Sequence, residues 1–75
     1  MVSKERLNPR SKAILEWLYS KGVPCTIQEI SDGVNVSWGA AKAHLDMLES
    51  YKFVVKVKRP KKIMYEFNYE LHGDE

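Results

Sequence analysis

Apolar and polar positions follow two different rhythms along this chain. From residue 9 to residue 51 the apolar residues recur every three or four positions, as Ile14, Leu15 and Leu18 do, which is typical of amphipathic helices. From Phe53 to Tyr69 apolar residues instead alternate with polar and charged ones, which is typical of half-buried strands. The pattern therefore predicts an α+β domain in which helices come first and a β-hairpin follows.

Capping residues divide the helical part and fix the first two helices. Asn8-Pro9 opens the first helix, because Asn is a favoured N-cap and Pro fits the first turn, and Lys21-Gly22 closes it. Thr26 and Glu29 have the spacing of a capping box and open a short second helix, which we expect to end at Asp32-Gly33. The segment between these helices, residues 23–25, contains a proline and is either a connector or a brief edge strand.

A third helix is predicted after a turn at residues 34–36. Ser37 is its N-cap, and the helix runs from Trp38 to about Tyr51. Apolar residues at spacings of four and three form one buried face: Ala41, Leu45 and Leu48. Helical geometry then turns five residues outward: Trp38, Gly39, Lys42, Ala43 and Asp46.

A cluster of cations occupies the predicted hairpin. Six of the chain's twelve Lys and Arg residues lie between Lys52 and Lys62, with no acid among them, although the whole chain carries only +2. Lys56 and Lys58 share one strand face. Concentrated like charge opposes folding through self-repulsion, so an acidic partner is expected, and nucleic-acid phosphate is the first candidate. The alternative interpretation is a strand edge that lysines protect against aggregation.

Several segments, in this order, resemble the winged helix-turn-helix of transcription regulators, as in the MarR and ArsR superfamilies. They are Thr26-Ile27-Gln28-Glu29-Ile30, Gly33-Val34-Asn35-Val36-Ser37, residues 41–49, and Tyr65-Glu66-Phe67-Asn68, which matches the closing strand of the wing. The resemblance covers residues 9–69 and implies three helices followed by a two-stranded β-hairpin wing. In its small size and lysine content the chain is similar to stand-alone regulators of archaea and of their viruses and plasmids.

The chain departs from the family pattern at three points. Lys52 stands where the family usually has a glycine, so the left-handed turn after the third helix falls to a costlier residue. The paired cysteines of the ArsR metal motif are absent. With Cys25 as the only cysteine, an internal disulfide and a zinc site built on several thiolates are excluded. The flanking dimerisation helices are also missing, and a homodimer through the first helix or the N-terminal arm is a possible arrangement.

The resemblance implies a way of binding double-stranded DNA. The third helix would lie in the major groove, and the wing would reach phosphates or the adjacent minor groove. The predicted contacts on the helices are Thr26, Ser37, Trp38, Gly39, Ala40, Lys42 and Ala43. Those on the wing are Lys56, Lys58, Arg59, Lys61 and Lys62. Because the third helix offers no Arg, Asn or Gln for bidentate readout, we expect modest base recognition and an affinity that comes mostly from phosphates.

Several side chains keep more than one interpretation. Trp38 stacks on the DNA backbone, packs against the wing, or contacts a protein partner. Trp17 and Tyr19 fit either the edge of the core or a dimer surface. His44 is expected to be a half-buried structural residue rather than a pH switch, and Cys25 a small buried hydrophobe rather than a redox sensor. Three aromatic residues on one strand face are expected to cover the helices: Tyr65, Phe67 and Tyr69.

Catalysis has no support in the sequence. No nucleophile-and-base spacing, glycine-rich phosphate loop or metal-ligand cluster occurs, so we expect a protein that is not an enzyme and uses no cofactor or metal; no small-molecule effector is evident from the sequence. The absence of a secretory signal and of a long apolar run predicts a cytoplasmic protein without a membrane partner.

Two functional hypotheses remain. The first is a duplex-DNA-binding transcriptional regulator that acts as a repressor, and the second is a winged-helix protein-interaction module that uses Trp38 and the aromatic residues of the first helix. Either would be a single domain of residues 1–75, with a core over 9–69 and frayed tails at 1–7 and 72–75.

Overall fold

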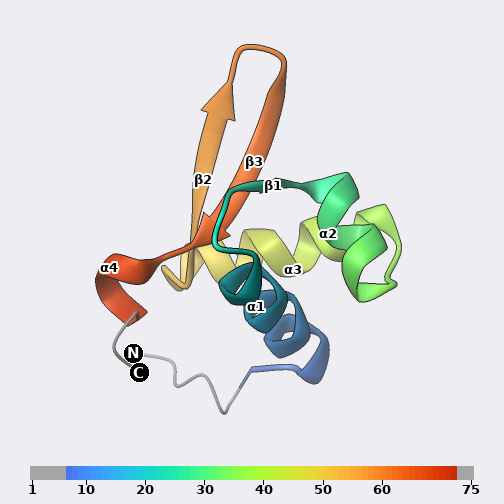
Figure 1. Cartoon of the computed structure of the whole chain (residues 1–75). Coiled ribbons are helices and arrows are strands. Elements are labelled where there is room, and N and C mark those ends of the chain that lie inside the picture. The colour runs from blue at the N-terminus through green and yellow to red at the C-terminus, as the bar shows by residue number, and fades with distance from the viewer. Residues whose placement is uncertain (1–6, 73–75) are drawn as a thin grey trace.

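The computed structural model describes residues 7–72, which form a winged helix-turn-helix (Figure 1). The elements follow in the order α1 (Pro9–Lys21), β1 (Cys25–Thr26), α2 (Ile27–Val34), α3 (Trp38–Ser50), β2 (Val54–Arg59), β3 (Lys62–Phe67) and α4 (Tyr69–His72). Helices α1, α2 and α3 pack against one another in pairs and form a helical base, from which the β2–β3 hairpin projects as the wing. The predicted α+β fold class is confirmed.

The predicted caps set the limits of α1 and the start of α2. The Asn8 side chain accepts a hydrogen bond from the backbone N–H of Arg10 at 2.8 Å, and Gly22 ends α1 with a left-handed φ of 71°. Thr26 Oγ1 accepts from the Glu29 N–H at 3.1 Å, and Glu29 Oε1 accepts from the Thr26 N–H at 2.8 Å. The hydrogen bond from the Thr26 backbone lowers the pKa of the Glu29 carboxyl. Local sequence therefore decides both helix starts.

The predicted end of α2 was wrong by two residues, and the reason lies in α1. The helix continues through Gly33 to Val34, and Asn35 supplies the left-handed cap with φ 58°. Gly33 stays inside the helix, where a Cβ atom would overlap the indole ring of Trp17. Trp17 is thereby placed at the edge of the core, half-buried, with Lys21 Nζ 5.0 Å from the ring centroid. Gly33 thus serves helix packing and not chain reversal.

The sheet has three antiparallel strands in the order β1-β3-β2, one more than the predicted hairpin. Strand β1 pairs Cys25 with Tyr65, so the segment after α1 is a brief edge strand. In the hairpin, Val54 lies opposite Phe67 and Lys56 opposite Tyr65. Because opposite residues share a face, Lys56 lies on the side of the sheet that covers the helices.

The core lies between the helical base and the end of the sheet farthest from the hairpin turn. The predicted inward face of α3 is confirmed, since Ala41, Leu45 and Leu48 are each 0% exposed. The other buried apolar residues are Leu7, Ile14, Leu15, Leu18, Cys25, Ile27, Ile30, Phe53, Val54, Tyr65 and Phe67. Small cores of this kind leave little stability in reserve.

The two ends of the domain differ from the prediction. Leu7 was expected in a frayed tail, yet its side chain is buried in the core. Tyr69 was expected on a strand face with Tyr65 and Phe67, but β3 ends at Phe67 and Tyr69 begins α4. Between the two elements Asn68 is anchored by its side chain, which donates to the Lys52 carbonyl at 2.9 Å, and by its backbone N–H, which donates to the Phe53 carbonyl at 3.0 Å. Helix α4 extends to residue 72, one residue into the predicted tail, while 1–6 and 73–75 lie outside the described residues.

Candidate nucleic-acid interface

The outward face of α3 begins with small side chains and one tryptophan. Ser37 Oγ accepts from the Ala40 N–H at 3.1 Å and so starts the helix as predicted. Trp38 is 48% exposed, and Gly39 and Ala43 are exposed as well. Ala40, which was predicted as a contact, is half-buried. The N-terminal part of this face is therefore accessible and nearly free of long side chains.

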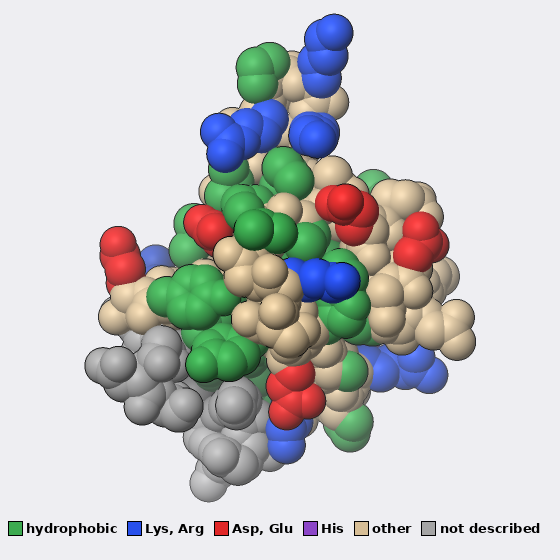
Figure 2. Space-filling model, in the orientation of Figure 1, with side chains coloured by type: hydrophobic (Ala, Val, Ile, Leu, Met, Phe, Trp, Pro, Cys, Tyr) green, Lys and Arg blue, Asp and Glu red, His purple; other side chains and the backbone are tan. Residues whose placement is uncertain are grey.

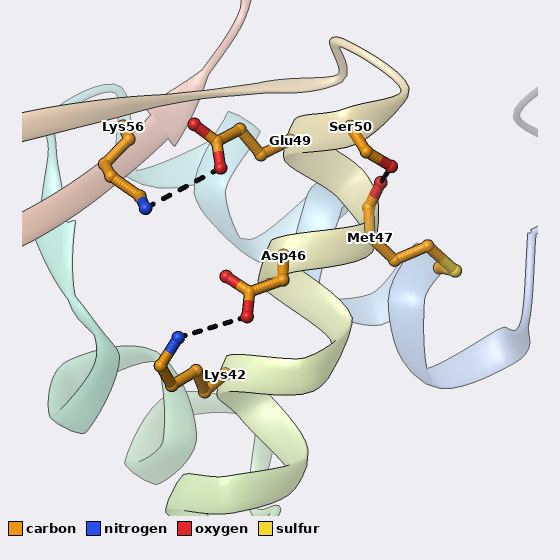
Figure 3. A network of polar contacts seen from close by, with 6 residues as sticks. All are labelled: Lys42, Asp46, Met47, Glu49, Ser50 and Lys56. Carbon is orange, nitrogen blue, oxygen red and sulfur yellow. Dashed lines mark hydrogen bonds and ion pairs between the residues drawn. The ribbon is translucent and has the colours of Figure 1, made fainter.

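Further along α3 the outward face carries paired charges (Figure 3). Lys42 Nζ lies 3.1 Å from Asp46 Oδ2, one helical turn away, and this hydrogen bond raises the pKa of the Lys42 ammonium. Glu49 Oε1 lies 3.8 Å from Lys56 Nζ, which reaches it from β2. Among the side chains of residues 7–70 these are the two ion pairs, and both join a predicted DNA-contacting lysine to a carboxylate of α3.

The cations at the tip of the wing have no such partners within the described part of the chain. Lys58, Arg59, Lys61 and Lys62 are all exposed, and Figure 2 shows basic side chains gathered on the projecting hairpin. The register places Arg59 opposite Lys62. Because side chains alternate along a strand, Lys58 lies on the helix side of the wing and the Arg59–Lys62 pair on the other side. The wing tip therefore presents positive charge from both of its faces.

Thr26, another predicted DNA contact, differs from these cations because its polar groups already form hydrogen bonds within the protein. It is half-buried in β1, and both its hydroxyl and its backbone N–H are engaged in the capping box with Glu29. The negative charge of Glu29 occupies this helix N-terminus, where a phosphate would otherwise be favoured. By contrast, the α2–α3 turn leaves Ser37 and Trp38 exposed at the start of α3.

An open groove separates the C-terminal half of α3 from the wing. Its volume is about 390 Å³, and its lining is mixed in charge: Asp46, Glu49, Ser50, Lys52, Val54, Val55, Lys56 and Asn68. Lys52 makes the turn into the wing with φ 69°, so the departure from the family's glycine is accommodated by a left-handed lysine. Three members of the two ion pairs line this groove at the base of the wing: Asp46, Glu49 and Lys56.

Aromatic side chains form a cluster away from the tip of the wing. The Tyr19 and Phe67 ring centroids lie 4.9 Å apart, as do those of Phe67 and Tyr69, and the Tyr69 hydroxyl donates to the Tyr19 carbonyl at 3.2 Å. Tyr19 is 52% exposed, so it belongs to a surface cluster on α1, β3 and α4. No local sequence pattern indicates this cluster, because its members are up to 50 residues apart.

His44 and Cys25, the remaining polar candidates, both lie in structural positions. His44 Nδ1 lies 2.9 Å from the hydroxyl of Ser11, which is fully buried between α1 and α3. Cys25 is buried, and this burial raises the pKa of its thiol. No group of three or more His, Cys, Asp or Glu residues that could hold a metal occurs in residues 7–72. Over the same residues, no helix is long and apolar enough to cross a membrane.

The fold and the surface together define a winged-helix domain with a cationic wing. Among solved structures, the chain is similar to the ST1889 protein of the thermoacidophilic archaeon Sulfolobus tokodaii, with a TM-score of 0.80 and 20% sequence identity. The match covers 95% of this chain and 74% of that one. At this identity the likeness shows the fold alone. No protein-family model and no curated protein matches the sequence.

Proposed function

We propose that this protein is a transcriptional regulator of the MarR/ArsR-like winged-helix type that binds duplex DNA. In this proposal α3 enters the major groove, and the wing contacts phosphates or the adjacent minor groove. The observation that carries the proposal is the group of cations on the projecting wing that form no ion pair with the part of the chain that the structure describes. Binding across a promoter would make the protein a repressor that acts on DNA in the cytoplasm.

The distribution of charge on the wing supports phosphate as the partner. Lys58 lies on one side of the hairpin, and Arg59 and Lys62 lie on the other. A groove of duplex DNA is bordered by two rows of phosphates, so a hairpin with cations on both faces can contact both rows. A strand edge that lysines merely protect from aggregation does not require cations at the turn as well, yet Lys61 lies there.

The surface of α3 supports a close approach to the groove. Gly39 and Ala43 are exposed, and a Cβ atom added at Gly39 would meet nothing within 4 Å. Small side chains let the helix backbone come near the base edges and contact thymine methyl groups. The N–H groups at the Ser37-capped helix start add a partial positive charge toward phosphate.

A salt titration of duplex binding tests the proposal. Fluorescence anisotropy of a labelled duplex should give a linear fall of log affinity with log salt, with a slope of about −0.9 per phosphate neutralised. The double variant Arg59→Ala/Lys61→Ala should make the slope shallower by about two. A matched control, Arg10→Ala/Lys12→Ala, removes one Arg and one Lys from the start of α1, at the opposite end of the base from the wing, and should keep the slope (Figure 1). Absence of binding at low salt, or equal slopes for the two double variants, contradicts the proposal.

A winged-helix protein-interaction module is the second candidate function, and exposed aromatic residues favour it. Trp38 and Tyr19 are 48% and 52% exposed. Under this alternative Trp38→Ala would leave duplex affinity unchanged and abolish binding to a protein partner. Under the proposed function, Trp38→Ala lowers duplex affinity.

A homodimer would let the protein cover two half-sites of an operator. Tyr19 and Tyr69, which are exposed and pack around the buried Phe67, provide an apolar surface for such an assembly. Sedimentation at micromolar concentration should then give a dimer for the wild type and a monomer for Tyr19→Asp. A monomeric wild type would exclude this part of the proposal without affecting DNA binding.

A further inference from the structure

The outward face of α3 places negative charge beside the proposed DNA contacts. Asp46 is hydrogen-bonded to Lys42, with both side chains close to half exposed at 49% and 44%. A carboxylate that approaches duplex DNA is repelled by the phosphates. The pairing with Lys42 reduces this repulsion but withholds the lysine from phosphates, and a hydrogen bond that the carboxylate accepts from a base offsets the repulsion further. Asp46 therefore opposes DNA binding in general and favours it at particular bases.

The major groove limits which bases can satisfy Asp46. The amino groups exposed there belong to cytosine N4 and adenine N6, and the characteristic partner of Asp and Glu is cytosine N4. A lysine ammonium prefers guanine O6 and N7. Lys42 and Asp46 thus present one donor and one acceptor that together are complementary to a G·C pair.

The geometry of α3 allows both side chains to reach neighbouring bases. Residues 42 and 46 are one turn apart on the same side of the helix, and their charged atoms already meet at 3.1 Å (Figure 3). Successive base pairs are stacked about 3.4 Å apart. Separating the ion pair by a small side-chain rotation therefore brings Lys42 and Asp46 to one base pair or to two adjacent ones.

We propose that Asp46 is a specificity-determining residue, which accepts a hydrogen bond from cytosine N4 while Lys42 turns from Asp46 to guanine. This inference rests on the proposed function and names the base pair, G·C, that α3 selects. At other sequences the Lys42–Asp46 pair stays closed, so that one cation is withheld from DNA and one anion faces it. The selectivity comes as much from repulsion at wrong sites as from attraction at the right one.

Glu49 provides a matched comparison, because it carries the same charge in a different setting. Both carboxylates line the groove between α3 and β2, but the partner of Glu49 is Lys56 on β2, at 3.8 Å, so Glu49 lies nearer the base of the wing, whereas Asp46 is paired along α3 with Lys42. In this position Glu49 lowers the charge available to phosphates without reaching base edges. Changing Glu49 should alter affinity for every duplex alike, whereas changing Asp46 should alter the preferred sequence.

Selection from a random duplex library, followed by anisotropy on the enriched duplexes, tests the inference. The wild type should enrich a G·C position and prefer it over an A·T replacement by about tenfold. Asp46→Ala should reduce this preference to about twofold or less and bind unrelated duplexes more tightly. Asp46→Asn should shift enrichment toward adenine, the partner of Asn, while Glu49→Gln should keep the G·C preference.

The outcomes separate this inference from the proposed function. A wild type that binds no duplex at low salt overturns both. A wild type that binds duplexes but enriches no G·C position overturns the role of Asp46 alone. The same holds if Asp46→Asn and Asp46→Ala enrich the sequences that the wild type enriches. Thermal unfolding of each variant shows whether a loss of preference comes from loss of the fold.

Discussion

The helical base and the wing tip obey opposite physical rules. In the base, residues such as Ile14, Ile30 and Leu48 are 0% exposed, and their burial stabilises the fold. At the wing tip, Arg59 and Lys61 are exposed, and their like charges oppose folding. The comparison teaches that, under the proposed function, stability and DNA affinity belong to separate regions of this small domain. Substitutions should therefore separate the two properties.

The largest expected effect is on the core of the base. Leu45 is 0% exposed on the inner face of α3, so Leu45→Ala should lower the free energy of unfolding by about 2–5 kcal/mol through lost burial and the cavity that remains. Urea unfolding followed by circular dichroism measures this change. Val55→Ala, on the exposed face of the sheet, is the control and should cost less than 1 kcal/mol by the rule for surface positions. Equal losses of unfolding free energy for Leu45→Ala and Val55→Ala would contradict the proposed difference between the base and the wing.

A second prediction concerns the contact between α1 and α2. Gly33→Ala introduces a Cβ atom into the Trp17 ring, so it should destabilise the protein by about 1–3 kcal/mol as an overpacking change. The double variant Gly33→Ala/Trp17→Ala should lose less than the sum of the single losses, because the clash is absent without the indole. Additive losses in the same unfolding experiment would show that the loss does not come from the Trp17 ring, and a gain for Gly33→Ala would show that the helix propensity of alanine outweighs the clash.

The capping box at the start of α2 should make stability depend on pH. The pKa of Glu29 is lowered in the folded protein, so its contribution is fully present above its ordinary value of 4.5 and is lost as the pH falls through the lower, folded value. Glu29→Gln keeps a capping amide but cannot titrate. The stability difference between wild type and Glu29→Gln should therefore be present at pH 7 and narrow at acid pH. A difference that is constant down to pH 3 would contradict the capping box.

A smaller effect is expected where the base joins the wing. Lys52 holds a left-handed φ of 69°, which costs a residue with a Cβ about 1 kcal/mol relative to glycine. Lys52→Gly should therefore raise the free energy of unfolding by about this amount, measured by urea unfolding. Lys52→Ala, which removes the same charge but keeps the Cβ, controls for the charge and should bring no such gain. Stabilisation by both would assign the effect to relief of charge repulsion.

Features that depend on local sequence were predicted well. The limits of α1 follow from Asn8 and Gly22, and the buried face of α3 follows from spacing alone. Features that depend on distant residues were missed. The need for Gly33 inside α2 is set by Trp17, on another helix, and the Glu49–Lys56 pair joins α3 to β2. The Lys42–Asp46 pair, by contrast, has the i,i+4 spacing that could have predicted it.

The measurement that tests the separation most directly combines stability and DNA binding in one wing variant. Arg59→Ala/Lys61→Ala should unfold within about 0.5 kcal/mol of the wild type, or be slightly more stable, because both side chains are exposed. The same protein should lose about two units of the slope of log duplex affinity against log salt. An unchanged slope in this folded variant would contradict the account, because the wing would then hold its charge for something other than DNA phosphate.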